Sequence, residues 1–172
     1  MATRTQICDA LLQAVTGLPT AGVHAFLWSG HPLEASSLPC ILLKMGAERN
    51  EYVSTDQPRA EKRVLDLELK CIAKASTGLQ PLLNLMAGEV EDAIAKTLYL
   101  GGLVFALDLV DSGWSLDGEA EQPHGAWSLQ YQATYFTREA SVPVAALSPL
   151  KDVLASAVPN VGAAHASGYQ KL

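Results

Sequence analysis

Positive charge is scarce in this sequence, and its scarcity limits the partners that the chain can recognise. The 172 residues include 12 Lys and Arg against 18 Asp and Glu, which gives a formal net charge of −6 at pH 7. Recognition of nucleic-acid phosphates usually needs a basic patch, and no cluster of Lys and Arg occurs along the chain. The charge balance therefore argues against nucleic-acid binding through a basic surface as the main function.

Cysteine is also scarce. The sequence contains Cys8, Cys40 and Cys71, which lie far apart and form no CxxC pair. Disulfide frameworks need patterned pairs of cysteines, and structural zinc sites need Cys and His at short spacings. We therefore expect three reduced, mostly buried thiols, with no metal and no cofactor.

Long hydrophobic runs are missing. No stretch approaches the roughly 18 consecutive apolar residues that indicate a membrane span, and the first residues lack the apolar core of a signal peptide. We expect no membrane contact, and a chain that stays in the cytoplasm or is built into a particle there. Hydrophobic residues still make up 49% of the sequence and charged residues 17%, so the apolar surface suffices for the core of one domain.

Catalytic motifs are missing as well, since the sequence has no P-loop, no GxGxxG and no GxSxG. The acidic residues between 117 and 121 crowd a predicted hairpin tip, where water would surround them, and this does not favour an acid–base pair. A small enzyme or ligand-binding domain remains an alternative. It would require His24, His31 or Cys40 to line a pocket beside a carboxylate with a shifted pKa.

The hydrophobic pattern predicts an α+β fold, because apolar residues recur at helical spacing in two segments, alternate in three others, and form short β-branched, aromatic or apolar runs in two more. Helices are expected over 3–16 and 78–100, and strands over 23–28, 40–48, 61–75, 103–116 and 125–139. The economical arrangement is a domain over 1–139 with a single mostly antiparallel or mixed sheet and two main helices packed on it. Residues 140–172 contain three prolines and many small residues, which predict an extended C-terminal arm.

The strand expected over 61–75 has the clearest pattern. One set of alternating side chains is apolar and is expected to face the core: Leu65, Leu67, Leu69 and Cys71. The other set is charged and is expected to face water or a partner: Asp66, Glu68 and Lys70. This period of two predicts a sheet with one buried face.

Two glycines and the strand over 103–116 give further expectations about local structure. Gly88 weakens the interior of the second helix, and a close approach of that helix to the sheet would explain its presence. Gly113 predicts a bulge or bend in the strand over 103–116. The side chains expected to point into the core from this strand are Leu103, Phe105, Leu107 and Leu109.

Charges of both signs alternate between the second and third predicted strands. These residues are Glu48, Arg49, Glu51, Asp56, Arg59, Glu61 and Lys62. Self-complementary charges suit head-to-tail contacts between identical subunits, and such contacts close into rings when the rotation permits. A loop that is simply solvated is the alternative reading of the same pattern.

Three stretches resemble the tail terminator proteins of long-tailed bacteriophages, the family typified by the minor tail protein U of phage lambda. LPCILLKMGAERNEY (38–52) resembles a strand of that family and the GAE-containing turn after it. RVLDLELKCIAKA (63–75) resembles the central strand, and LVDSGWSLDGEAEQPHGAWSLQYQATYF (109–136) resembles the closing hairpin with its acidic tip. The similarity in order and spacing covers residues 3–139, and the arm departs from the family pattern.

The resemblance implies a structural virion protein and no enzyme. Family members form a ring, usually a hexamer, that caps the tail tube, stops its polymerisation and offers a joining surface for the head. The implied partners are other copies of the chain, the tail tube protein and the head-connector or neck protein, with assembly in the host cytoplasm. The alternative within this class is a neck, head-closure or tail-completion subunit.

The resemblance also implies where contacts form. The loop expected over 49–62 would lie at contacts between ring subunits. DNA would pass through the bore of the ring without specific binding, because the acidic balance of the chain would keep it from adhering.

Overall fold

The computed structural model describes residues 2–28, 30, 34–55, 58–75, 77–117, 124–139, 154–155 and 170–171. The chain divides into two compact units, Met1–Glu139 and Ala140–Leu172. In the second unit, β6 (Leu154–Ala155) and β7 (Gln170–Lys171) form an antiparallel pair. The rest of the predicted C-terminal arm lies outside the described residues.

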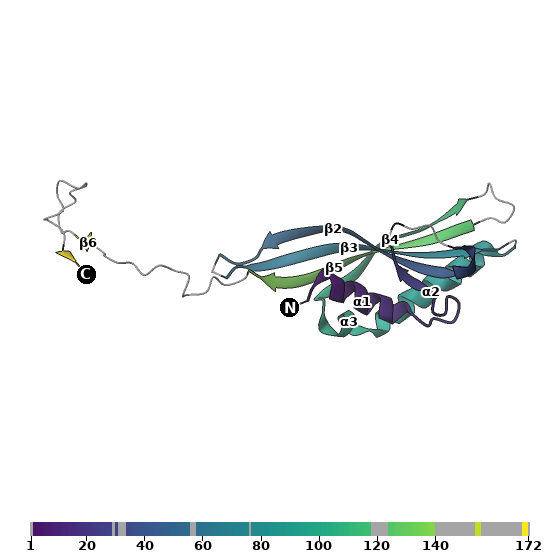
Figure 1. Ribbon diagram of the computed structural model, residues 1–172, viewed down its shortest axis with the longest axis horizontal. Helices are drawn as coiled ribbons and strands as arrows, with labels where there is room; N and C mark the ends of the chain where they lie inside the picture. The colour runs from purple at the N-terminus through teal and green to yellow at the C-terminus, as the bar shows by residue number, and fades with distance from the viewer. Residues whose placement is uncertain are drawn as a thin grey trace. The chain divides into compact units, whose positions relative to one another are not determined.

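The first unit contains one mixed sheet of five strands with helices packed on one face (Figure 1). In chain order its elements are α1 (Arg4–Val15), β1 (Ala25–Leu27), a 3₁₀ turn η1 (Ala35–Ser37), β2 (Cys40–Tyr52), β3 (Ala60–Lys74), α2 (Leu79–Lys96), α3 (Leu98–Gly102), β4 (Ala106–Asp117) and β5 (His124–Arg138). The strand order is β1-β2-β3-β5-β4, with β1 and β2 parallel and the other neighbours antiparallel. The predicted α+β class is confirmed.

The start of α1 follows directly from its sequence. The Thr3 side chain accepts a hydrogen bond from the Gln6 backbone N–H (3.2 Å), and the Gln6 side chain accepts one from the Thr3 backbone N–H (3.0 Å). This capping box satisfies two backbone donors that no helical carbonyl can reach. The buried stripe of α1 consists of Ile7, Cys8, Leu11 and Val15.

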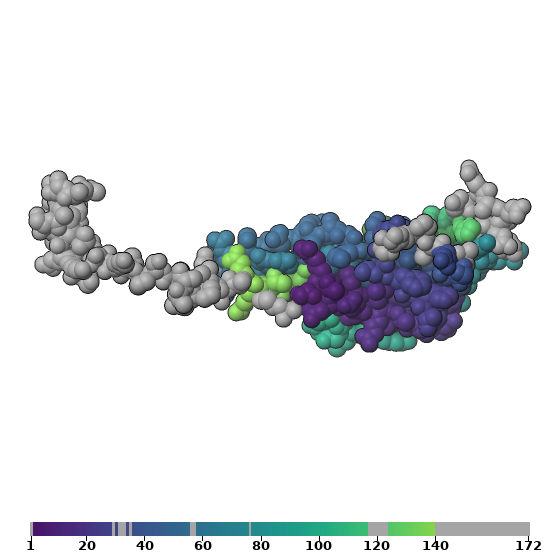
Figure 2. Space-filling view, viewed as in Figure 1, coloured from purple at the N-terminus to yellow at the C-terminus, as the bar shows by residue number. Residues whose placement is uncertain are grey.

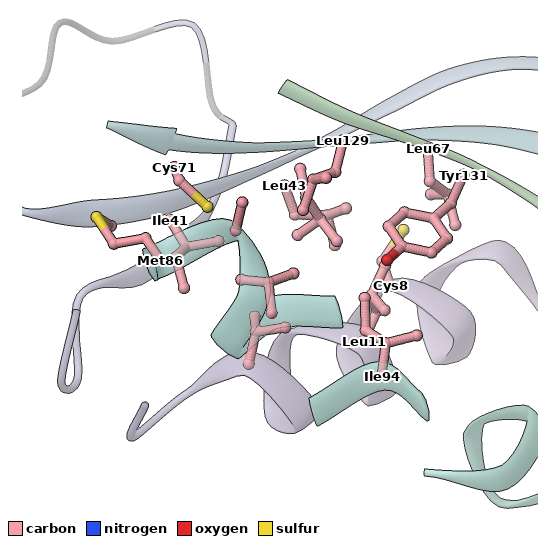
Figure 3. Packing of buried hydrophobic residues seen from close by; sticks show 14 of the residues in the cluster. Cys8, Leu11, Ile41, Leu43, Leu67, Cys71, Met86, Ile94, Leu129 and Tyr131 are labelled. Atoms are coloured by element: carbon pink, nitrogen blue, oxygen red, sulfur yellow. The ribbon is translucent and has the colours of Figure 1, made fainter. Parts of the chain in front are cut away.

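The core lies between the helices and one face of the sheet. Leu43, Leu67 and Leu129 point from three neighbouring strands toward the helices, and Leu11 and Met86 point back at them (Figure 3). All five side chains are buried. Burying a side chain of this size contributes roughly 1.5–3 kcal/mol to the stability of the fold. The helices therefore cover the face of the sheet on which the alternation along β3 places the leucines.

The hairpin of β2 and β3 is longer than predicted. β2 continues to Tyr52 and β3 starts at Ala60, so half of the loop expected over 49–62 is strand. A bulge between Met45 and Glu48 shifts the register of β2. Beyond this bulge β2 is mainly polar, and a strand without apolar alternation resembles a loop in sequence.

The second helix is shorter than predicted. α2 ends at Lys96, and α3 is a tight turn in which Leu98, Tyr99 and Leu100 have φ angles of 21°, 52° and 52°. A left-handed backbone costs an L-residue roughly 1–2 kcal/mol. Burial of the Leu100 side chain in the core offsets part of this cost. Apolar residues continue through the turn, so the sequence pattern does not show where the helix ends.

The expectations for Gly88 and Phe105 are wrong. Gly88 is exposed and a Cβ added there would meet nothing within 4 Å, so no close approach explains it. The close approach lies in β5, where a Cβ on Gly125 would come within 2.8 Å of Leu83 Cδ1. Phe105 does not point into the core, because it is 70% exposed and packs edge-on against Phe136 with ring centroids 5.5 Å apart.

Gly88 and Gly125 give a matched test of how α2 packs on the sheet. We expect Gly88→Ala to raise the free energy of unfolding by about 1 kcal/mol, because alanine has the higher helix propensity and nothing obstructs its methyl group. Gly125→Ala should lower it by about 1 kcal/mol or more, because the methyl group must displace Leu83. Urea unfolding followed by circular dichroism measures both changes, and equal effects of the two variants would contradict this packing.

Candidate assembly surface

No helix covers the second face of the sheet within the part of the chain that the structure describes (Figure 1). Residues paired across neighbouring strands point to the same face, so the register identifies the members of this open face. Its central side chains are Leu42, Lys44, Arg49, Lys62, Asp66, Glu68, Lys70, Ile72, Gln130 and Gln132. In the space-filling view, α1 lies along the lower side in purple and the β2–β3 hairpin along the upper side in blue (Figure 2).

Charged side chains at the centre of the open face pair with one another. Glu68 lies 3.2 Å from Lys70 and 3.7 Å from Lys44, and the Arg49 guanidinium donates to Asp66 (2.8 Å). Each exposed ion pair of this kind contributes about 0–1 kcal/mol to the stability of the fold. Their main effect is therefore to orient the side chains. Two lysines share the Glu68 carboxylate, which leaves this part of the face with an excess of positive charge.

An apolar groove lies on the open face. Its lining residues, from β2, β3, β5 and the position after β1, are Trp28, Leu42, Lys44, Lys70, Ile72 and Ala126. Its volume is about 420 Å³. Trp28 is 46% exposed, and its backbone N–H donates to the Leu43 carbonyl (2.7 Å), which holds the residue beside β2. Exposed apolar surface next to charged side chains is typical of a binding site.

β4 is an edge strand, and we call the outer side of Ala106–Asp117 the β4 edge. It pairs with β5, and no other strand of the described residues pairs with it. Its exposed large apolar side chains are Leu109, Val110, Trp114 and Leu116. The bulge lies between Leu109 and Asp111, and the prediction of a bulge at Gly113 is wrong. The predicted inward direction of Leu109 is also wrong, because this side chain lies at the surface. An exposed apolar edge strand is a site at which another chain can pair.

Two carboxylates border the open face on β4. Asp108 and Asp111 are exposed and lie opposite Gln132 and Gln130 of β5. Neither forms an ion pair with another described residue. The open face therefore has an acidic border at β4 and a basic region around the groove.

A cluster of charged side chains ties the start of α1 to the helix side of the sheet. Glu48 accepts hydrogen bonds from the Arg4 guanidinium and the Tyr135 hydroxyl, and Arg63 Nη1 lies 3.4 Å from it. Arg63 also donates to Glu61 (2.6 and 2.9 Å). The hydrogen bond from Arg4 is the main cause of the lowered pKa of Glu48, and burial raises the pKa of Tyr135.

The charged residues predicted at ring contacts separate into groups. Glu48 and Glu61 point to the helix side and are paired within the chain, and Glu61 is only 6% exposed. The members on the open face are Arg49, Glu51 and Lys62. Arg59 lies between β2 and β3 with its guanidinium 5.2 Å from the centre of the Tyr52 ring, while Asp56 lies outside the described residues. Their role in subunit contacts stays a prediction.

The groove and the β4 edge are not among the sites predicted from the sequence. The groove residues come from segments that are far apart along the chain, so no local pattern unites them. The β4 edge carries one local signal. Leu109 and Val110 are adjacent apolar residues, and such a pair breaks the strict alternation of a half-buried strand.

The residues of the enzyme alternative do not form a site in the described part of the chain. His24 stacks on Phe26 with ring centroids 6.2 Å apart, and His31 lies outside the described residues. Burial raises the pKa of Cys40 to about 11 and that of Cys71 to about 12, so both thiols stay protonated near neutral pH. The described residues contain no group of three or more His, Cys, Asp or Glu that could hold a metal, and no helix long and apolar enough to cross a membrane.

The thiols can be tested directly. We expect a disulfide reagent such as DTNB to react slowly with Cys8, Cys40 and Cys71 in the native protein at about pH 8, because burial shields the thiols and keeps them protonated. Reaction should be rapid and complete after unfolding in urea. Rapid reaction of any one thiol in the native protein would identify an activated cysteine and support the enzyme alternative.

Glu48 should make the stability depend on pH. Its pKa is lower in the folded chain than its ordinary value of 4.5, so its stabilising effect is complete above that value and is lost as pH falls through the folded-state pKa. Glu48→Gln should lower the free energy of unfolding near neutral pH by about 1–3 kcal/mol and flatten its decline in acid. Urea unfolding over a pH series measures this, with Glu51→Gln on the exposed face as control. An unchanged acid decline in Glu48→Gln would contradict the assignment.

Comparisons with known proteins give little beyond this geometry. No protein-family model matches the chain, and no curated protein matches it. A chain in a solved structure described as "Virion of native gene transfer agent (GTA) particle" aligns with 77% of this chain and 95% of its own length, at 12% identity and a TM-score of 0.36. A TM-score this low establishes neither a shared fold nor a shared function.

Proposed function

We propose that this chain is a structural subunit of a phage tail and acts as a tail terminator. Its ring would cap the tail tube, stop polymerisation of the tube protein and present a surface to the head-connector protein in the virion neck. The resemblance of residues 38–52, 63–75 and 109–136 to the tail terminator family supports the proposal.

The observation that carries the proposal is the open face of the sheet together with the apolar β4 edge, neither of which is covered by a described element. β4 is 12 residues long and exposes several large apolar side chains. Monomeric proteins usually protect such an edge, because it invites pairing with other chains. In a closed ring of identical copies, the next subunit can cover the same edge on every copy, so no edge is left free.

The charge of the chain suits the proposed location. With a net charge of −6, the surface repels nucleic-acid phosphates more than it attracts them. DNA would therefore pass through the ring without specific binding. The function proposed is one of shape and charge complementarity, and it requires neither a catalytic group nor a cofactor.

Sedimentation of the full chain, with and without its tail tube protein, tests this function. We expect a closed ring, formed by the chain alone or on tube ends, and inhibition of tube elongation. A head-closure subunit would bind the connector and leave tube growth unchanged. A chain that stays monomeric and does not affect tube polymerisation would overturn the proposal.

Arg59 tests whether the β2–β3 connection takes part in ring contacts. Arg59→Glu should weaken ring formation, because it reverses the charge at a predicted subunit contact. Arg59→Lys is the control, because lysine keeps the charge and can also lie over the Tyr52 ring. Sedimentation at matched concentrations compares the variants. Unchanged assembly of Arg59→Glu would exclude this connection from the ring interface.

A further inference from the structure

We propose that the β4 edge of one copy docks into the open-face groove of the next copy, with Val110 in the groove and Asp108 and Asp111 facing Lys44 and Lys70. The contact rests on the proposed ring function and specifies the two surfaces that would meet in it. The partner that fills the groove is therefore a second copy of this chain.

The two surfaces carry opposite charge. Beside the groove, Lys44 and Lys70 share the carboxylate of Glu68, so among the described residues one positive charge is unbalanced. On β4, Asp108 and Asp111 have no ion pair with any described residue, which leaves two negative charges unbalanced. Complementary charges on two surfaces steer them together and fix their register.

The spacing of the charges also matches. Asp108 and Asp111 lie opposite β5 residues that are two positions apart, which separates them by roughly 7 Å along the strand. Lys44 lies opposite Glu68, and Lys70 is two positions from Glu68 on β3, so the lysines are diagonal neighbours roughly 7 Å apart. Both ion pairs can therefore form in the same contact.

The bulge in β4 supplies the apolar part of the contact. The register shifts between Leu109 and Asp111, and Val110 at the shift is 52% exposed. A bulge re-aims a side chain, and here it presents an apolar residue beside the two carboxylates. Trp28 and Ile72 line the groove that would receive it. Apolar contact at the centre with charges around it is the usual arrangement of a specific interface.

The position of the two surfaces gives the contact a direction. The groove centres on β2 and β3, whereas β4 is the last strand at the opposite edge of the sheet. After one groove receives one edge, each pair of copies still has a free groove and a free edge. Such a head-to-tail contact repeats from copy to copy and closes into a ring when the rotation permits.

A charge exchange in the full-length chain tests the contact. Lys70→Glu and Asp111→Lys should each weaken ring formation, measured as the concentration for half-assembly in sedimentation, by about tenfold or more. The double variant, Lys70→Glu with Asp111→Lys, places opposite charges together again and should recover most of the loss. Lys96→Glu and Asp92→Lys, on the exposed side of α2, are the matched controls and should assemble normally. Val110→Ser should weaken assembly without changing the circular dichroism spectrum.

The outcomes separate this contact from the ring function. A double variant as weak as the singles, or weaker, would overturn the pairing of these charges. Normal rings from both single variants would overturn the contact while leaving the proposed tail terminator in place. A wild-type chain that forms no ring, alone or with tube protein, would overturn the proposed function and this contact with it.

Discussion

The rest of the structure depends on one constraint, which is that the described helices cover only one face of the sheet. Alternation along β3 and β5 places apolar side chains on one face, where α1 and α2 bury them. Because side chains in a strand alternate strictly, the same residues that build the core force charged and polar neighbours onto the other face. The described part of the chain provides no second layer for that face, and it becomes the surface available to partners.

The parts of the fold that obey a simple period could be predicted from the sequence. The stripe of Ile7, Leu11 and Val15 and the Thr3 cap predict α1, and the alternation around Leu67 predicts β3. Failures occur where the apolar pattern and the backbone conformation do not end at the same residue. Apolar residues continue past Lys96 into a left-handed turn, and polar residues continue β2 where apolar alternation has ended.

The candidate site was predictable only in part. Alternation correctly places Asp66, Glu68 and Lys70 on the face away from the helices. The alternation that puts Leu65 in the core also puts Glu61 on the helix side, whereas the direction of Glu48 depends on the bulge in β2, which the sequence does not show. The groove is formed by tertiary structure alone, since strand order brings its lining residues together from distant segments.

The central claim is that copies of this chain meet through the open face and the β4 edge. Hydrogen–deuterium exchange of the full chain, compared between dilute monomer and assembled protein, tests it most directly. The account predicts slower exchange in Ala106–Asp117 on assembly, because its outward amides become covered, with no change in α1 and α2. Slower exchange confined to the helices, with β4 unchanged, would contradict it.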